Sequence, residues 1–198
     1  SPAPRISADT RILITGACGF VGAHLLRALN AEGATPFAVH LPGEALPADA
    51  QAEFLGMDLA KPEIPESLVR DLRPQIVVHL AAQLKAERTW DFAEESFATN
   101  LAATQNLMVA IGKHVPEVRR LVLLGSAEEY GNTTALPVTE DAPLHPVSPY
   151  SAGKAAATQL ARLYHELFRL PVTILRPFIL YGPGQSTSMM LPQMITSI

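Results

Sequence analysis

At 198 residues, with 48% hydrophobic and 17% charged residues, the chain is long enough for one domain around a buried core. A net charge of −4 without a basic run argues against nucleic acid as a partner, and no apolar stretch is long enough for a membrane span or a signal peptide. The single cysteine excludes an internal disulfide, and the six histidines show no metal-ligand spacing, so we expect a cytoplasmic protein without a metal site.

Short β-branched runs alternate along the chain with longer helical patterns. In chain order we expect a strand at 11–15, a helix at 19–32, strands at 36–40 and 53–57, a helix at 65–72, a strand at 75–80, a helix at 94–113, a strand at 120–125, a helix at 149–168, a strand at 172–175 and the start of another element at 189–198. Strands that are apolar throughout need cover on both faces, which right-handed helical crossovers supply. The order predicts an α/β fold with a doubly wound parallel sheet, whose ligands bind beyond the carboxyl ends of the strands.

A glycine-rich loop joins the first expected strand to the first expected helix. Residues 15–22 read Thr-Gly-Ala-Cys-Gly-Phe-Val-Gly. A tight turn at this point exposes backbone N–H groups and the positive end of the helix dipole to a pyrophosphate. The glycine spacing alone is weak evidence, but its place between strand and helix favours a dinucleotide site over a plain turn. We interpret Cys18 as a small loop residue rather than as a nucleophile.

The end of the second strand leaves the choice of dinucleotide open. An acidic residue there selects the ribose hydroxyl of NAD, and a nearby arginine suits the extra phosphate of NADP. His40 and Leu41 stand at this point, so neither signal is clear. Asp58, after the third strand, is a candidate acceptor for the adenine amine, although an exposed loop aspartate is equally compatible with the sequence.

Tyr150 and Lys154 form the candidate catalytic pair. Ser148 is suited to cap a helix that starts at Pro149, so the two side chains lie four residues apart on one helix face. Lowering the pKa of a tyrosine by about 3 units requires roughly 4 kcal/mol, and an ammonium group at about 4 Å supplies a similar energy at an effective dielectric of about 20. We therefore expect Lys154 to lower the pKa of Tyr150, the acid or base at a substrate oxygen, which Ser126 hydrogen-bonds.

With these motifs the chain resembles the extended short-chain dehydrogenase/reductase family, the NAD-dependent epimerases and dehydratases of nucleotide sugars. The resemblance runs from Arg11 onward and implies NAD or NADP as cofactor, a nucleotide-sugar substrate and a Rossmann-like fold. Its further motifs are Asp58-Leu59, His79-Leu80-Ala81-Ala82, Asn100, the stretch 125–131 and the stretch 176–184. The cofactor contacts that it implies are Gly16, Gly19, Phe20, Val21, Gly22, His40, Asp58, Leu59, Leu80, Ala81, Ala82, Asn100, Tyr150, Lys154, Pro177 and Phe178.

Two departures from the family pattern bear on the reaction. Ala127 stands where 4,6-dehydratases carry an aspartate that acts as the acid for water elimination, which leaves Glu128 as a single carboxylate candidate for catalysis or substrate binding. Ile179 replaces an asparagine that commonly contacts the sugar nucleotide, and an apolar side chain cannot make that hydrogen bond. Gln83 is a further candidate for the substrate pocket.

The resemblance is greatest to GDP-4-keto-6-deoxymannose reductases, so we expect a 4-ketoreductase before a 4-epimerase and an epimerase before a 4,6-dehydratase. A non-catalytic NAD(P)-binding sensor is the alternative from another class, and the intact Ser126, Tyr150 and Lys154 argue against it.

The expected organisation is an N-terminal tail at 1–10, an NAD(P)-binding Rossmann domain at 11–185 and, at 186–198, the start of a smaller substrate-binding lobe that is largely missing from the sequence. The family resemblance implies a homodimer through helices 94–113 and 150–168. We also expect Trp90 in the core, Lys85 on a solvated face and Arg176 as an anchor of its loop.

Overall fold

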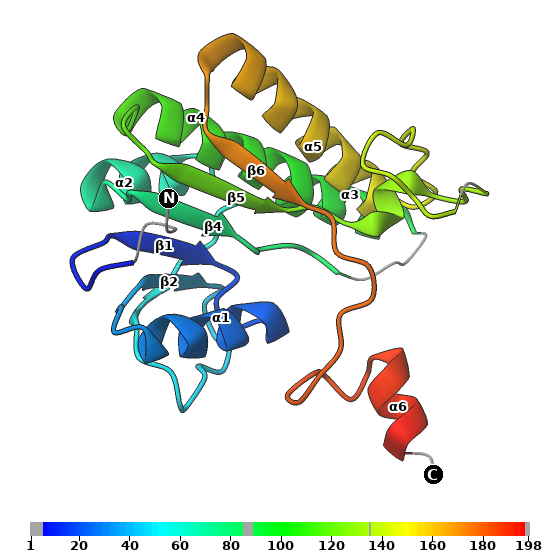
Figure 1. Ribbon diagram of the computed structural model, residues 1–198, viewed down its shortest axis with the longest axis horizontal. Coiled ribbons are helices and arrows are strands. Elements are labelled where there is room, and N and C mark those ends of the chain that lie inside the picture. The colour runs from blue at the N-terminus through cyan, green and yellow to red at the C-terminus, as the bar shows by residue number, and fades with distance from the viewer. Residues whose placement is uncertain (1–5, 85–88, 135, 197–198) are drawn as a thin grey trace.

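Six parallel strands form one sheet at the centre of the molecule (Figure 1). The computed structural model describes residues 6–84, 89–134 and 136–196. The strands are β1 (Ile12–Thr15), β2 (Phe37–His40), β3 (Glu53–Gly56), β4 (Ile76–His79), β5 (Arg120–Leu124) and β6 (Val172–Leu175). They lie in the order β3-β2-β1-β4-β5-β6. The predicted doubly wound Rossmann-like sheet is confirmed, and the strand order reverses between β1 and β4.

Helices cover both faces of this sheet. The helices are α1 (Phe20–Ala31), α2 (Glu63–Leu72), α3 (Trp90–Phe97), α4 (Ala103–His114) and α5 (Pro149–Phe168), with a π-helical turn η1 (Ala98–Ala102) and a 3₁₀ turn η2 (Ala127–Tyr130). A further helix, α6 (Met190–Thr196), does not cover the sheet. Alternate strand residues point to opposite faces. Leu13 of β1 belongs to the core that includes α2, α4 and α5, whereas Ile12 and Ile14 belong to the core against α1. Figure 1 shows α1 on one side of the sheet and α4 and α5 on the other.

The long helix expected at 94–113 is the main difference from the sequence analysis. It begins earlier, at Trp90, where the side chain of Thr89 accepts a hydrogen bond from the backbone of Phe92, and η1 interrupts it. Trp90 itself is 91% exposed, so the expectation of a core residue is wrong. It is the first residue of α3. The predicted bounds of α5 and β6 are confirmed.

The carboxyl ends of the parallel strands meet at one edge of the sheet. The loops that follow β1, β4, β5 and β6 therefore lie at the same edge. The first and the last of these loops are more than 150 positions apart in the sequence. From these loops the chain runs to α6, which Figure 1 shows apart from the sheet. Within the described residues, no helix combines the length and apolar character that a membrane crossing requires.

Candidate active site

The glycine loop after β1 is shaped by close contacts that leave no room for side chains. Gly16 adopts a φ of +68°, and a Cβ atom there would lie 2.6 Å from the backbone nitrogen of Ala81. A Cβ atom on Gly22 would meet the carbonyl oxygen of Gly16. Gly19 is the N-cap of α1 and has no side chain to occupy the N–H groups of the first turn. The loop therefore offers the backbone cradle and helix dipole that a pyrophosphate requires.

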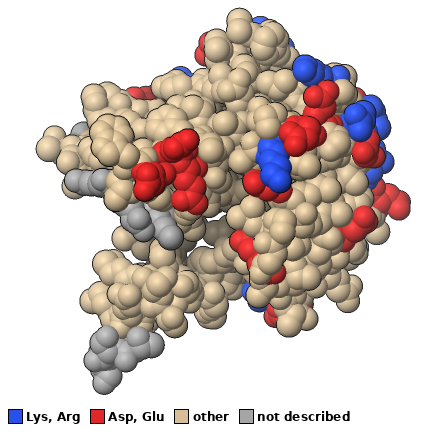
Figure 2. Space-filling model, turned by 180° about the vertical axis from the view of Figure 1, so that it is seen from behind, with Lys and Arg blue, Asp and Glu red and all other residues tan. Residues whose placement is uncertain are grey.

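A cleft of about 890 Å³ joins this loop to the loops after β4, β5 and β6. Its volume lies within the usual range for small-molecule and cofactor sites. The predicted site residues on its walls are Gly16, Gly19, Phe20, Val21, Gly22, Leu80, Ser126, Glu128, Tyr150, Pro177, Phe178 and Ile179. Residues 189–191, which belong to the expected start of the substrate-binding lobe, line it from the start of α6. Figure 2 shows the molecule hollowed between its larger body and the segment below it.

Tyr150 and Ser126 meet inside this cleft. Tyr150 is in the first turn of α5, where Ser148 caps the helix and Pro149 occupies its first position, and both Tyr150 and Ser126 line the cleft. Burial raises the pKa of Tyr150 above its ordinary value, the neighbouring Ser126 side chain opposes this shift, and the nearby carboxylate of Glu128 adds to it. The phenol is thus a protonated group on the cleft wall at neutral pH.

Lys154 lies behind the tyrosine and is only 4% exposed. Its Nζ donates a hydrogen bond of 2.7 Å to the carbonyl oxygen of Leu124, the last residue of β5. Burial lowers the pKa of Lys154 to about 8, and the carboxylate of Glu129 opposes this shift. The expectation that the ammonium group lowers the pKa of Tyr150 is wrong in this structure, because the ammonium donates to a backbone carbonyl and burial of the phenol outweighs the opposing effects.

A largely buried ion pair holds the turn that carries Ser126. Glu129 Oε1 accepts a hydrogen bond of 2.8 Å from the backbone N–H of Ser126, and Oε2 accepts one of 2.9 Å from Nε of Arg176. Arg176 also donates to the hydroxyl of Tyr130 and lies 5.1 Å from the centre of that ring. The expected anchoring by Arg176 is confirmed. Glu129 was missed, although the Ser-x-x-Glu spacing of a capping box was a signal for it.

A second buried network fixes the loop after β4. Thr104 donates its hydroxyl proton to the carbonyl oxygen of Asn100, so it accepts from Nε2 of His79 at 2.9 Å. Nδ1 of His79 then accepts from the hydroxyl of Thr15 at 2.6 Å, and that hydroxyl accepts from the backbone N–H of Ala81. Burial lowers the pKa of His79 to about 3, so the ring is neutral. The network holds the loop after β4 against the glycine loop.

Several predicted contact residues make internal bonds, and they are not among the residues on the cleft walls. Asn100 is buried, accepts the backbone N–H of Gln83 and donates to its carbonyl oxygen, while the side chain of Gln83 bonds Glu95. Asp58 accepts the N–H of Ala60 within its own turn. Leu59 is a core residue, Ala81 and Ala82 are half-buried, and His40 bonds the carbonyl oxygen of Leu41. Their predicted cofactor and substrate contacts stay predictions. Lys85 lies outside the described residues.

The geometry of these loops fits a dinucleotide. A glycine cradle that any Cβ would fill lies at the N-terminus of α1, at the point where the strand order of the sheet reverses. Ser126 and Tyr150 line the same cleft. One continuous site can therefore hold a long ligand along the glycine loop and a reacting oxygen at the phenol.

Comparison with known proteins agrees with this site. A UDP-glucose 4-epimerase of Mycolicibacterium smegmatis is 30% identical over 183 residues, which are 88% of this chain and 58% of the relative. A dTDP-glucose 4,6-dehydratase of Streptomyces griseus is 34% identical over 197 residues, which are 94% of this chain and 59% of the relative. The chain thus spans about three-fifths of the length of these relatives.

Solved structures that are similar to this chain include the same two kinds of enzyme. A dTDP-glucose 4,6-dehydratase of Streptomyces venezuelae with NAD bound has a TM-score of 0.83 and 29% identity, and the match covers 95% of this chain and 62% of that one. A UDP-glucose 4-epimerase of Thermotoga maritima with UDP-glucose has a TM-score of 0.82 and 26% identity, covering 89% of this chain and 58% of that one. The model of the NAD dependent epimerase/dehydratase family matches residues 12–198. The chain therefore belongs to the NAD dependent epimerase/dehydratase family.

Proposed function

We propose that this chain is the cofactor-binding part of an NAD(P)-dependent enzyme that reduces a keto group of a nucleotide-linked sugar. The observation that carries the proposal is that Ser126 and Tyr150 line the same cleft as the glycine loop. Relatives support the substrate and cofactor classes, because two similar structures hold NAD and UDP-glucose. Resemblance to GDP-4-keto-6-deoxymannose reductases is the basis for placing the ketone at C4.

The residues of the chain have separate tasks in this reaction. Residues 16–22 bind the pyrophosphate, and Ser126 and Tyr150 bind the substrate oxygen. A bound NAD(P)H would supply the hydride to the carbon of the ketone. Tyr150 donates its proton to the oxygen as the ketone becomes an alcohol, and its raised pKa keeps the phenol protonated at neutral pH. Lys154 holds the end of β5 through the carbonyl oxygen of Leu124.

The carboxylates of the cleft argue for reduction over dehydration. Ala127 offers no acid, and Glu128 is an exposed single carboxylate on the cleft wall. Elimination of water from a sugar needs a paired acid and base, whereas reduction needs only the proton of Tyr150. Ile179 is exposed on the same wall and contributes contact area without a hydrogen bond to the sugar. Epimerisation is the second candidate, because it uses the same tyrosine and cofactor.

The test is incubation of the protein with candidate nucleotide sugars and either NADH or NADPH. Oxidation of the cofactor in proportion to product indicates a reductase, inversion without net oxidation an epimerase, and loss of water a dehydratase. Tyr150→Phe is expected to lower turnover at least about 10²-fold while cofactor affinity changes less than about twofold. Tyr164→Phe, on the same helix, is the matched control. Full function of Tyr150→Phe would support the non-catalytic sensor and overturn the proposal.

We also propose that two copies of the chain associate through α3 and α5. The support is a set of exposed apolar side chains on these two helices: Phe97, Leu163, Leu167 and Phe168. Leu167→Glu is expected to lower the mass measured by light scattering from that of a dimer to that of a monomer. Cytoplasmic location and a substrate lobe that starts at 186–198 remain proposals, the latter supported by the cleft contacts of residues 189–191.

A further inference from the structure

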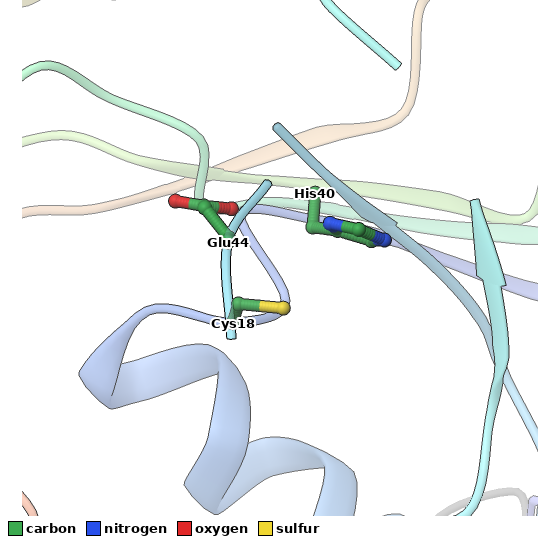
Figure 3. A group of neighbouring side chains, drawn as sticks. All are labelled: Cys18, His40 and Glu44. Atoms are coloured by element: carbon green, nitrogen blue, oxygen red, sulfur yellow. The ribbon is translucent and has the colours of Figure 1, made fainter. Parts of the chain in front are cut away.

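Three side chains with metal-binding atoms lie together beside the glycine loop. Cys18 belongs to that loop, His40 is the last residue of β2, and Glu44 follows in the next loop. The sulfur, one ring nitrogen and one carboxylate oxygen lie within 4.8 Å of one another. Figure 3 shows the three side chains as neighbours from separate segments, with the ring of His40 extending away from Cys18 and Glu44. The sequence analysis excluded a metal site from local spacing, which cannot detect a group formed by two loops.

The chemistry of the three donors selects zinc over other common metal ions. Thiolate, imidazole and carboxylate all bind Zn²⁺, at about 2.3, 2.0 and 2.1 Å respectively, whereas Mg²⁺ and Ca²⁺ prefer oxygen alone. Those bond lengths place neighbouring ligand atoms about 3.3–3.8 Å apart in a tetrahedron. The ligand atoms need to approach one another by at most about 1.5 Å, and Glu44 is exposed.

Backbone groups of Leu41 support two of the three ligands. His40 Nδ1 lies 2.9 Å from the carbonyl oxygen of Leu41, which can only accept, so Nδ1 carries the proton. The unprotonated Nε2 lies beside Gly56 of β3, and the ring must turn for this nitrogen to reach the ion. A zinc-bound histidine usually donates its other N–H in this way. Glu44 Oε2 accepts the N–H of Leu41 at 2.9 Å, which leaves Oε1 for the metal.

We propose that Cys18, His40 and Glu44 bind one zinc ion, and that this ion and the dinucleotide exclude each other. Cys18 lies on the wall of the cleft, within the loop that contacts the pyrophosphate. The end of β2, where His40 stands, is the place at which folds of this kind bind the adenosine ribose. An ion held between these two points occupies the path of the cofactor. The exclusion rests on the proposed function, but zinc binding does not.

The test of the site is a titration of the purified protein with Zn²⁺ alone against a chromophoric chelator. One equivalent is expected to bind, and Cys18→Ser, His40→Asn and Glu44→Gln are each expected to weaken binding at least about tenfold. His114→Gln is the control, because His114 lies at the end of α4 and pairs with Glu66. Co²⁺ gives a thiolate absorption band that Cys18→Ser must abolish. Absence of stoichiometric binding, or binding that the three variants leave unchanged, overturns the site.

Exclusion is tested in the same samples by adding NADH. Because coupling between two ligands is reciprocal, NADH must weaken zinc binding by the factor by which zinc weakens NADH binding. Zinc binding that NADH leaves unchanged, while NADH itself binds, overturns the exclusion and retains the site. If neither NADH nor NADPH binds to the metal-free protein, the proposed function fails and the zinc titration still decides whether the site exists.

Discussion

The buried pair of Glu129 and Arg176 allows a quantitative test of what holds the Ser126 turn in place. Glu129 has no exposed area and the Arg176 side chain is 13% exposed. Arg176→Met removes the partner and leaves a carboxylate without access to water, which costs about 3–5 kcal/mol in comparable buried pairs. Glu129→Gln keeps an oxygen for the N–H of Ser126 and leaves an arginine that still donates to Tyr130, so its cost should be smaller, about 1–3 kcal/mol.

The double variant separates this explanation from a general loss of packing. With both charges removed, no ion is left buried, so Glu129→Gln with Arg176→Met should be more stable than Arg176→Met alone. The assay is urea unfolding followed by circular dichroism, evaluated as a double-mutant cycle. Arg27→Met breaks an exposed ion pair with Asp49 at 2.8 Å and should leave the unfolding free energy unchanged. If the double variant is no more stable than Arg176→Met, a buried uncompensated charge is not the cause.

Three further predictions concern the glycine loop, the buried lysine and the buried histidine. Gly16→Ala should weaken NADH binding at least about tenfold, measured by fluorescence, because its Cβ meets backbone, whereas Gly33→Ala, also at positive φ but with open space around it, should not. Burial lowers the pKa of Lys154 from 10.5 to about 8, so as the pH rises the folded state loses this proton before the unfolded state does. The contribution of Lys154 to the free energy of unfolding therefore rises between these two pH values. Lys154→Met should lose that rise, at most roughly 3 kcal/mol, when unfolding is compared at pH 7 and pH 10. Thr104→Val leaves a buried N–H of His79 without its acceptor and should cost about 1–3 kcal/mol in urea unfolding.

Features that depend on one strand, one turn and one helix were predictable from the sequence. The glycine loop, the cap at Ser148 and the start of α5 follow from local backbone rules, and the structure has them at the predicted residues. The sheet was predictable because continuous apolar strands separated by helices fit few arrangements. The interruption at Ala98–Ala102 was not, because η1 forms where buried Asn100 bonds Gln83 in another loop.

Contacts between residues of neighbouring loops at the carboxyl edge of the sheet could not be predicted from local sequence patterns. Glu129 and Arg176 are 47 positions apart and meet because β5 and β6 are neighbours. Cys18 and Glu44 likewise come together only because β1 and β2 are adjacent. A residue type alone did not indicate such a partner, so the sequence analysis treated Cys18 as a loop residue and assigned no function to Glu129.

The pKa of Tyr150 shows why an energy taken from one neighbour can point in the wrong direction. An ammonium group at about 4 Å would favour the phenolate by about 4 kcal/mol at an effective dielectric of about 20, but that value excludes the loss of hydration around the phenol. In the structure burial is the largest influence, and the Lys154 ammonium is bonded to Leu124. A phenol that keeps its proton at neutral pH is suited to donate it to an oxygen that gains negative charge. Since the cleft also lacks an acid at Ala127, both observations favour reduction of a ketone over elimination of water.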